Sequence, residues 1–181
     1  MEPMGPAGSS ELVMGYDAEF SDYATARWRA LVRTGVLLGC DLVEAEDLAQ
    51  QTLLRCYLKW GSVQRAADRD AYVARVQLSL LRQSRRRRWW GERATDALPE
   101  RTTADGTARV DDADALRRAL GRLPEAQRQA VVLRHYLHFT ELQIADATGV
   151  ARGTVKSRLS RALAVLVEDP DLAVLREDAH E

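Results

Sequence analysis

The stretch TELQIADATGVARGTVKSRLSRALA, residues 140–164, has the pattern of two short helices joined by a tight turn. Thr140 and Gln143 have the spacing of a capping box, which predicts that a helix begins here. Gly149 provides the left-handed backbone on which helices commonly end. Apolar residues then recur at intervals of three and four positions and predict a second helix: Val155, Leu159, Ala162, Leu163 and Leu166.

The other face of this second helix is basic and polar, and it carries Arg152, Thr154, Lys156, Ser157, Arg158 and Arg161. Residues 116–162 contain nine cations and three acids, although the whole chain has a formal net charge of -1. A basic helix after a tight turn is typical of a helix-turn-helix, whose second helix enters the DNA major groove. A helical hairpin with a merely solvated basic face is the alternative. The local excess of positive charge favours the DNA-binding interpretation.

Composition limits the class of protein. The chain has 181 residues, 46% of them hydrophobic, and no apolar run approaches the length of a membrane span, so we expect a soluble protein. Residues 1–15 lack the features of a secretion signal and are expected to form a disordered leader. Cys40 and Cys56 lie far apart without a neighbouring histidine, which predicts two free, buried thiols in a reducing cytoplasm and no metal site.

The first half of the chain predicts three more helices. An apolar stripe predicts a helix over residues 17–38. Asp41 and Glu44 form another capping box, from which we expect a helix that Gly61 ends. The residues expected on the inward face of that helix are Ala45, Leu48, Ala49, Thr52 and Cys56.

The third of these helices begins near Asp70 and ends in the strongly basic sequence RQSRRRRWWGER, residues 82–93. Four consecutive arginines, residues 85–88, repel one another unless anions lie near them. Both a solvated helix end and a contact with the DNA backbone explain such a run, and the second basic cluster in the helix-turn-helix favours the DNA contact. Trp89 and Trp90 fit base stacking and core packing equally well.

Residues 95–112, TDALPERTTADGTARVDD, interrupt the helical pattern and are longer than an ordinary loop within a domain. The second half then predicts a helix over residues 113–122 and another that has Pro124 at its first position and runs to about His135. The fold class expected is therefore all-α, with two small helical domains and a flexible linker. Its boundaries are a leader over residues 1–15, a first domain over 16–94, a linker over 95–112, a second domain over 113–168 and an acidic tail over 169–181.

Two parts of the chain together resemble a known family, the extracytoplasmic-function (ECF) group of bacterial RNA polymerase sigma factors, in its SigE-like branch. LPEAQRQAVVLRHYLHFTELQIADATGVARGTVKSRLSRAL, residues 123–163, is similar to region four of these proteins. AEDLAQQTLLRCYLKW, residues 45–60, and AYVARVQLSLLRQSRRRR, residues 71–88, look like region two. The resemblance covers residues 16–93 and 113–166, and it implies a region-two helical bundle and a region-four helix-turn-helix.

The resemblance also implies a function. Such a chain would bind core RNA polymerase through its β′ clamp and β flap, recognise the −35 and −10 promoter elements and promote DNA opening. It would need no cofactor and would not be an enzyme. Promoter DNA, core polymerase and an anti-sigma factor are the implied partners, with no membrane partner and a cytoplasmic location.

The family's site residues are carried over position by position. The segment that packs on the polymerase clamp corresponds here to Asp47, Gln50, Gln51, Leu54 and Arg55, with Gln51 in place of the usual glutamate. The −10 element would meet the loop over residues 63–70 and the helix after it, through Tyr72, Arg75, Ser79, Arg82, Arg85, Arg86, Arg87 and Arg88. The −35 element would meet the basic face of the helix-turn-helix. Gln143 replaces the family's usual glutamate and still caps its helix.

Two other classes are alternatives. A helix-turn-helix regulator that does not dock on polymerase would leave the acidic and amide side chains at Asp47, Gln50 and Gln51 without a role. An enzyme would need a constellation of catalytic groups, and the sequence has no phosphate-binding glycine loop and no metal-ligand spacing. His135 and His138 lie beside aromatic residues, which favours a structural role.

Overall fold

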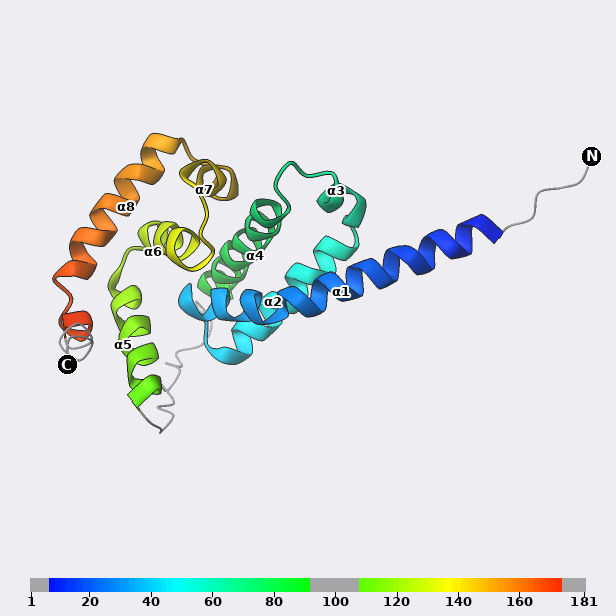
Figure 1. Cartoon of the computed structure of the whole chain (residues 1–181). Helices are drawn as coiled ribbons and strands as arrows, with labels where there is room; N and C mark the ends of the chain where they lie inside the picture. The colour runs from blue at the N-terminus through cyan, green and yellow to red at the C-terminus, as the bar shows by residue number, and fades with distance from the viewer. Residues whose placement is uncertain (1–6, 92–107, 174–181) are drawn as a thin grey trace, which may run out of the picture.

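The computed structural model describes the backbone of residues 7–91 and 108–173, and the side chains of residues 17–89 and 112–173. Within these ranges all regular secondary structure is helical, which confirms the predicted fold class. The elements in chain order are α1 (Ala7–Leu37), α2 (Leu42–Tyr57), α3 (Trp60–Gln64), α4 (Arg69–Gly91), α5 (Ala108–Arg122), α6 (Glu125–Val131), a π-helical turn η2 (Val132–Tyr136), α7 (Glu141–Thr148) and α8 (Arg152–Val167) (Figure 1).

Both predicted capping boxes are present. The Asp41 carboxylate accepts a hydrogen bond from Glu44 N at 2.8 Å, and Asp41 N donates to Glu44 Oε2 at 3.2 Å. Thr140 and Gln143 make the equivalent pair of hydrogen bonds at 3.3 and 2.7 Å. Gly149 ends α7 with a φ of 72°, a left-handed conformation in which a side chain would be strained. These local signals fix where α2 and α7 begin and where α7 ends.

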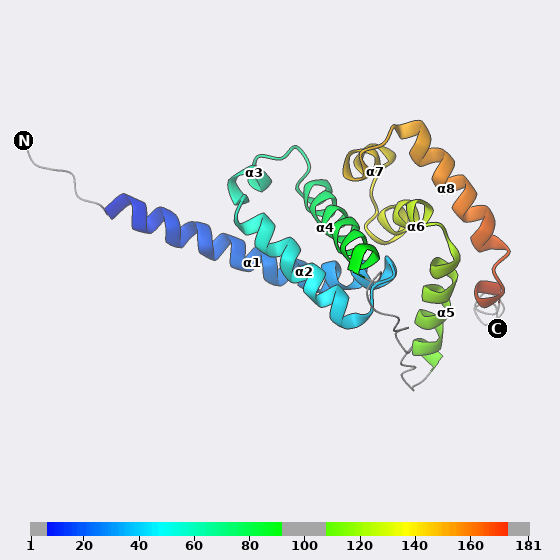
Figure 2. The same cartoon turned by 180° about the vertical axis from the view of Figure 1, so that it is seen from behind.

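The first domain consists of α1, α2 and α4, with the short α3 at one end of the bundle (Figures 1 and 2). The side of α2 that was predicted to face inward is buried as a whole. Trp60 is completely buried, and its ring meets Phe20 at 5.2 Å and Tyr23 at 4.9 Å between centroids. This aromatic cluster ties α1 to α3 and gives the first domain an apolar core of its own.

In the second domain, α8 packs on α6 and α7, and α5 lies beside the C-terminal end of α8 (Figure 1). Arg122 Nη1 donates to both carboxylate oxygens of Asp169 at 2.9 and 2.8 Å, and Arg122 Nη2 donates to Asp171 at 2.6 Å. The Asp169 side chain is only 2% exposed. The start of the predicted acidic tail is therefore a structural part of the second domain, where it joins α5 to the end of α8.

Several predicted boundaries are wrong. α1 begins at Ala7, inside the leader that was expected to be disordered, since extending an existing helix costs far less than nucleating one. α5 begins at Ala108, so residues 108–112 are helical and do not belong to the linker. α2 ends at Tyr57, and Gly61 lies inside α3. The rest of the predicted linker and the end of the tail lie outside the described residues.

The two domains pack against each other, which the sequence did not predict. One continuous apolar cluster includes Leu78 and Leu81 from the first domain, and Leu133 and Phe139 from the second. In both views α4 lies beside α7, and the two helices are in contact (Figures 1 and 2). The chain is thus a closed arrangement of two domains. In the described residues, no helix has both the length and the hydropathy to cross a membrane.

Candidate functional site

The recognition helix of the helix-turn-helix, α8, lies at the outer edge of the molecule (Figures 1 and 2). Val155, Leu159 and Ala162 hold it on the domain and are buried, as predicted. Leu163 was expected to join them but is 42% exposed, because it is rotated by about 100° from Ala162 around the helix. All six predicted −35 residues lie on the accessible surface: four are exposed, and Ser157 and Arg158 are half-buried.

The cations of α8 differ in what holds them. Arg152 Nε donates to Glu141 Oε2 at 2.8 Å, and this hydrogen bond lowers the pKa of Glu141 below its ordinary value. Lys156, Arg158 and Arg161 make no hydrogen bond or ion pair through their side chains to any residue that the structure describes. They are therefore the cations of α8 that are available for phosphates or base edges.

The four arginines near the end of α4 divide into two pairs. Arg85 Nη2 donates to the Leu38 carbonyl at 2.7 Å and Arg85 Nη1 pairs with Glu125 at 2.9 Å, while Arg88 pairs with Glu44. Arg86 and Arg87 are exposed and have no such partner in the described part of the chain. Trp89 is 72% exposed, so it is not a core residue. The side chain of Trp90 lies outside the described residues.

The remaining −10 candidates lie further toward the start of α4. Tyr72 packs, half-buried, against the cluster around Trp60. Arg75 pairs with the Asp146 carboxylate of α7, and its Nε also donates to the Asp146 carbonyl at 3.1 Å. Ser79 accepts a hydrogen bond from Gln83 at 3.3 Å. Arg82 is exposed. The structure therefore places these residues on one helix, but it holds Arg75 in a contact between the domains.

Asp68 lies in the loop before α4 and makes hydrogen bonds to residues of both domains. Its carboxylate caps α4 by accepting a hydrogen bond from Ala71 N at 2.8 Å, and its second oxygen accepts one from the Gln143 side chain of α7. The pKa of Asp68 lies below its ordinary value, first because of the Ala71 hydrogen bond and then because of that from Gln143. The loop that was expected to meet the −10 element is thus joined to the helix-turn-helix.

The candidate polymerase-binding residues lie on the solvent-facing side of α2. Asp47, Gln50 and Arg55 are exposed, Leu54 is 58% exposed, and Gln51 donates to Asp47 at 2.6 Å. Sequence reasoning missed two apolar residues on the same side, Val43 and Leu58, which are 76% and 72% exposed. The sequence indicated these two residues by their spacing, because they are apolar but do not share the helical periodicity of the buried side of α2. Exposed apolar residues among polar ones are typical of a protein-binding surface. We call this set, residues 43, 47, 50, 51, 54, 55 and 58, the clamp surface.

The chemistry of the remaining polar groups does not indicate a metal or a nucleophile. Burial raises the pKa of both Cys40 and Cys56 to about 11, so that both thiols are protonated at neutral pH. His135 and His138 are exposed. Within residues 17–89 and 112–173, no group of three or more potential metal ligands comes together.

The fold and these surfaces define a class of protein: a helical DNA-binding protein with a solvent-facing basic recognition helix and a second basic helix in a separate bundle. Comparison with known proteins identifies the family. A family model described as sigma-70, region 4 matches residues 113–166. The sequence is 38% identical over 161 residues to the RNA polymerase sigma-E factor of Streptomyces coelicolor, covering 86% of this chain and 88% of that protein.

A second relative, the ECF RNA polymerase sigma factor SigL of Mycobacterium tuberculosis, is 32% identical over 154 residues, covering 82% of this chain and 85% of that protein. The structure is similar to that of the sigma factor RpoE of Bartonella quintana, solved with the anti-sigma factor NepR, with a TM-score of 0.72, 26% identity and coverage of 83% and 95% of the two chains. The chain belongs to the ECF group of RNA polymerase sigma factors. It acts with RNA polymerase in promoter recognition, and a regulator that acts without polymerase is not favoured.

Proposed function

We propose that the chain directs RNA polymerase to promoters through three surfaces on three helices. The clamp surface of α2 docks on the β′ clamp, α8 binds the −35 element, and α4 with the loop before it binds the −10 element. The second domain also meets the β flap. The observation that carries this proposal is the row of cations on α8 that face solvent without partners in the described residues.

Binding of the −35 element follows from the geometry of α8. An α-helix fits the major groove, where arginine side chains make bidentate hydrogen bonds to guanine. Arg158 and Arg161 are the candidates for base contacts, and each such contact discriminates against a wrong base by about 1–3 kcal/mol. Lys156 carries a point charge and suits a phosphate. The ion pair of Arg152 with Glu141 fixes that side chain at the start of α8.

Binding of the −10 element would use the exposed cations of α4. Opening a duplex costs on the order of 1.4 kcal/mol per base-pair step, and the separated strand has to be held if it is to stay open. Arg82, Arg86 and Arg87 are exposed and positioned to neutralise its phosphates. Trp89 adds an exposed aromatic face next to them, on which a base can stack. No covalent chemistry is required of the protein.

The clamp surface provides the platform that makes two weak DNA contacts effective. Tethering both DNA-binding helices to one polymerase raises the effective concentration of the second contact once the first has formed. The mixed surface of α2, with apolar Val43, Leu54 and Leu58 around the polar Asp47 and Gln50, suits a protein partner better than a nucleic acid. A protein with polymerase and promoter DNA as its partners acts in the cytoplasm, where both are found.

A regulatory protein completes the proposed set of partners. The RpoE structure to which this fold is similar was solved with an anti-sigma factor. A protein of that kind, binding this chain when it is idle, is consistent with the exposed apolar residues on α2.

Transcription in vitro tests the proposal. Purified chain and core polymerase are incubated with a library of random promoters, and the transcripts are sequenced. We expect transcripts that start at a fixed distance downstream of two conserved elements, and none from core polymerase alone. A chain that fails to bind core polymerase, or that supports no transcription from any template, contradicts the proposed function.

A further inference from the structure

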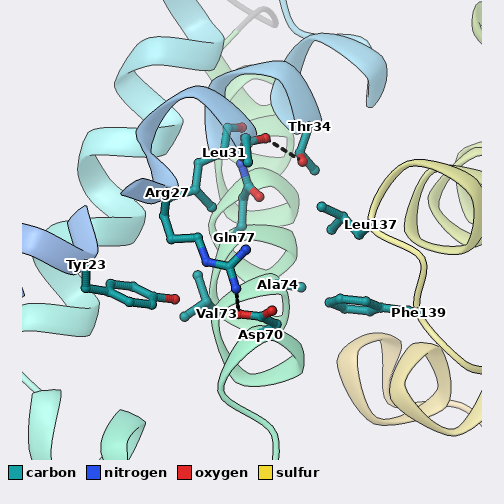
Figure 3. A pocket seen from close by; sticks show the side chains of 11 residues that line it. Tyr23, Arg27, Leu31, Thr34, Asp70, Val73, Ala74, Gln77, Leu137 and Phe139 are labelled. Atoms are coloured by element: carbon teal, nitrogen blue, oxygen red, sulfur yellow. Dashed lines mark hydrogen bonds and ion pairs between the residues drawn. The ribbon is translucent and has the colours of Figure 1, made fainter. Parts of the chain in front are cut away.

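The helix-turn-helix is held in different ways at its two ends. Before α7, Leu137 and Phe139 line a cavity together with Ala74 of α4, and Phe139 is only 4% exposed (Figure 3). Toward the end of α8, by contrast, Leu163 and Val167 are 42% and 60% exposed. Apolar packing therefore anchors the start of the helix-turn-helix more firmly than the C-terminal end of its recognition helix.

The C-terminal end of α8 is held by ion pairs instead. Arg122 of α5 donates through Nη1 to both carboxylate oxygens of Asp169, and through Nη2 to Asp171 at 2.6 Å. Arg118, one turn earlier on α5, donates to Asp171 at 3.3 Å. Asp171 N also donates to Asp169 Oδ1 at 3.0 Å, which fixes the two acids relative to each other. We call the four residues 118, 122, 169 and 171 the clasp.

The clasp fixes a direction as well as a distance. The Asp169 side chain is only 2% exposed, and a buried carboxylate that loses its partner is strongly unfavourable. The hydrogen bonds from Arg122 and then from Arg118 lower the pKa of Asp171 below its ordinary value, so Asp171 is charged at neutral pH. Because a guanidinium is a planar fork, one arginine that binds two carboxylates restrains their orientation.

The clasp also accounts for part of the basic excess in residues 116–162. Arg118 and Arg122 are two of the nine cations in that stretch, and both are paired with acids just beyond α8. They are therefore engaged within the second domain, and they are not free charges for DNA.

Sideways movement of α8 is opposed by little apolar packing. Its buried residues Val155, Leu159 and Ala162 lie on a single stripe, and Leu163 beside that stripe is 42% exposed. With Val155 as a pivot, a swing of about 10° moves Arg161, about 9 Å further along the helix, by about 1.6 Å. Such a shift breaks a bidentate hydrogen bond to a base, whereas the attraction between a cation and a phosphate falls only slowly with distance.

We propose that the clasp positions α8 for recognition of the −35 element, so that its four residues act on base contacts that they do not make themselves. This inference rests on the proposed function, which assigns the −35 element to α8. In this role the clasp determines sequence specificity. The affinity for DNA of any sequence depends on phosphate contacts, so it is affected much less.

A charge-neutral variant tests the proposal. Arg122→Lys keeps the positive charge on α5, but a lysine is a point charge and cannot hold both acids in a fixed orientation. The matched control is Arg117→Lys, because Arg117 pairs with Asp114 of the same helix and does not reach the end of α8. Neither variant changes the net charge, so neither changes the general attraction to DNA.

Each form of the full chain is assembled with core polymerase, and transcription is measured on a promoter recovered from the random library. It is also measured on a set of templates in which one base pair of the −35 element at a time is changed. The ratio of the two outputs gives the discrimination at each position. We expect Arg122→Lys to lower this ratio by up to about tenfold at the positions that matter most to the unaltered chain, because a displaced side chain no longer distinguishes the bases. The control is expected to keep every ratio.

Unchanged ratios in Arg122→Lys overturn the proposal. A uniform loss of output from all templates leaves the ratios unchanged and is what a merely structural role produces, so it has the same consequence. Ratios that fall equally in Arg117→Lys also overturn it, because they show no special role of the clasp. If the unaltered chain supports no transcription, the proposed function is wrong and the positioning role fails with it. If the unaltered chain discriminates at the −35 element and Arg122→Lys discriminates equally well, only the positioning role is wrong.

Discussion

Arg152 and Arg158 lie on the same helix and have the same side chain, but the structure gives them different roles. Arg152 is held by Glu141, whereas Arg158 is half-buried and its side chain forms no hydrogen bond or ion pair with any described residue. A cation with a fixed partner contributes less to DNA binding, because its partner has to be displaced or kept. At the scale of single residues, the available partners decide function more than residue type does.

Replacing Arg158 with alanine is expected to lower transcription from a promoter that depends on its −35 element by about tenfold or more, the effect of one lost base contact. Affinity for core polymerase should not change, because α8 lies apart from the clamp surface (Figure 1). The two quantities are measured by transcription in vitro and by binding to labelled core. Arg29→Ala, at an exposed position of α1, is the control for the lost charge. A loss of core affinity in Arg158→Ala would show that the role of Arg158 is wrongly assigned.

Asp68 predicts a dependence of stability on pH. Its pKa is lowered in the folded chain, so its charge stabilises the folded state above the ordinary value of 3.8, and this stabilisation is lost as pH falls through the folded pKa. Asn also caps helices well but does not titrate. We expect Asp68→Asn to be less stable than the unaltered chain at neutral pH, and the difference to vanish in acid. Denaturant unfolding at a series of pH values measures it. A difference that persists in acid contradicts the assignment.

At the scale of the helix, α2 has two faces with different partners. One face, with Ala45, Ala49 and Cys56, is fully buried in the first domain. The opposite face leaves Leu54, and Leu58 just after the helix, 58% and 72% exposed, so that both leucines bury little apolar surface in the free chain. The exposed face therefore has its use in an assembly.

Leu54→Ala is expected to weaken binding to core polymerase by about tenfold, the effect of losing the burial of one leucine side chain at an interface. The free energy of unfolding of the free chain should hardly change, because Leu54 is 58% exposed. Leu142→Ala is the control, since Leu142 is a leucine of similar exposure, 65%, on α7. Equal losses of core affinity in the two variants would remove the support for the clamp surface.

The arginines at the end of α4 predict a separation of stability from DNA binding. Arg86→Ala with Arg87→Ala removes two exposed cations and is expected to reduce transcription and the salt dependence of DNA binding, with no change in thermal stability. Arg85→Ala with Arg88→Ala removes the same charge but breaks contacts with Leu38, Glu125 and Glu44, so it is expected to lower the melting temperature. The idea fails if both pairs lower the melting temperature equally.

At the scale of the whole molecule, the apolar core does not stop at the boundary between the domains. The cluster that contains Leu78 and Leu81 of α4 continues into Leu133 and Phe139 of the second domain. Residues that share one cluster unfold together when no part of it is stable alone. The free chain is therefore expected to behave as one cooperative unit, although its two halves meet different partners.

Phe139→Ala is expected to destabilise the free chain by about 3–5 kcal/mol, as for other buried phenylalanines. Because all four tryptophans lie in the first half of the sequence, their fluorescence reports on the first domain, while circular dichroism reports on both. We expect the two signals to shift together in denaturant unfolding. A fluorescence transition that stays in place while the circular dichroism transition moves would show that the domains are independent.

Much of this protein follows from local sequence. The two capping boxes, the glycine after α7 and the apolar spacing of α2 and α8 act within a few residues, so the helices and the turn of the helix-turn-helix were predicted correctly. The family was likewise predicted from the motifs of the two regions, and the comparisons confirm it. The exposed face of α2 was only partly identified, because Val43 and Leu58 are apolar residues and in a sequence they cannot be told from core residues.

The sequence by itself therefore determined an all-α sigma factor, its helix-turn-helix and most of the buried faces of α2 and α8. Only the tertiary structure decided how these faces are used in the closed chain: that Arg75 and Arg85 meet carboxylates of the second domain, and that Asp169 belongs to its fold. The physical reason is range. Caps and helical periodicity depend on neighbours one or two turns away. The local sequence around an exposed arginine is the same whether that arginine contacts water, a phosphate or a carboxylate some 40 to 70 positions away in the chain. Only the docking of whole helices selects among these partners.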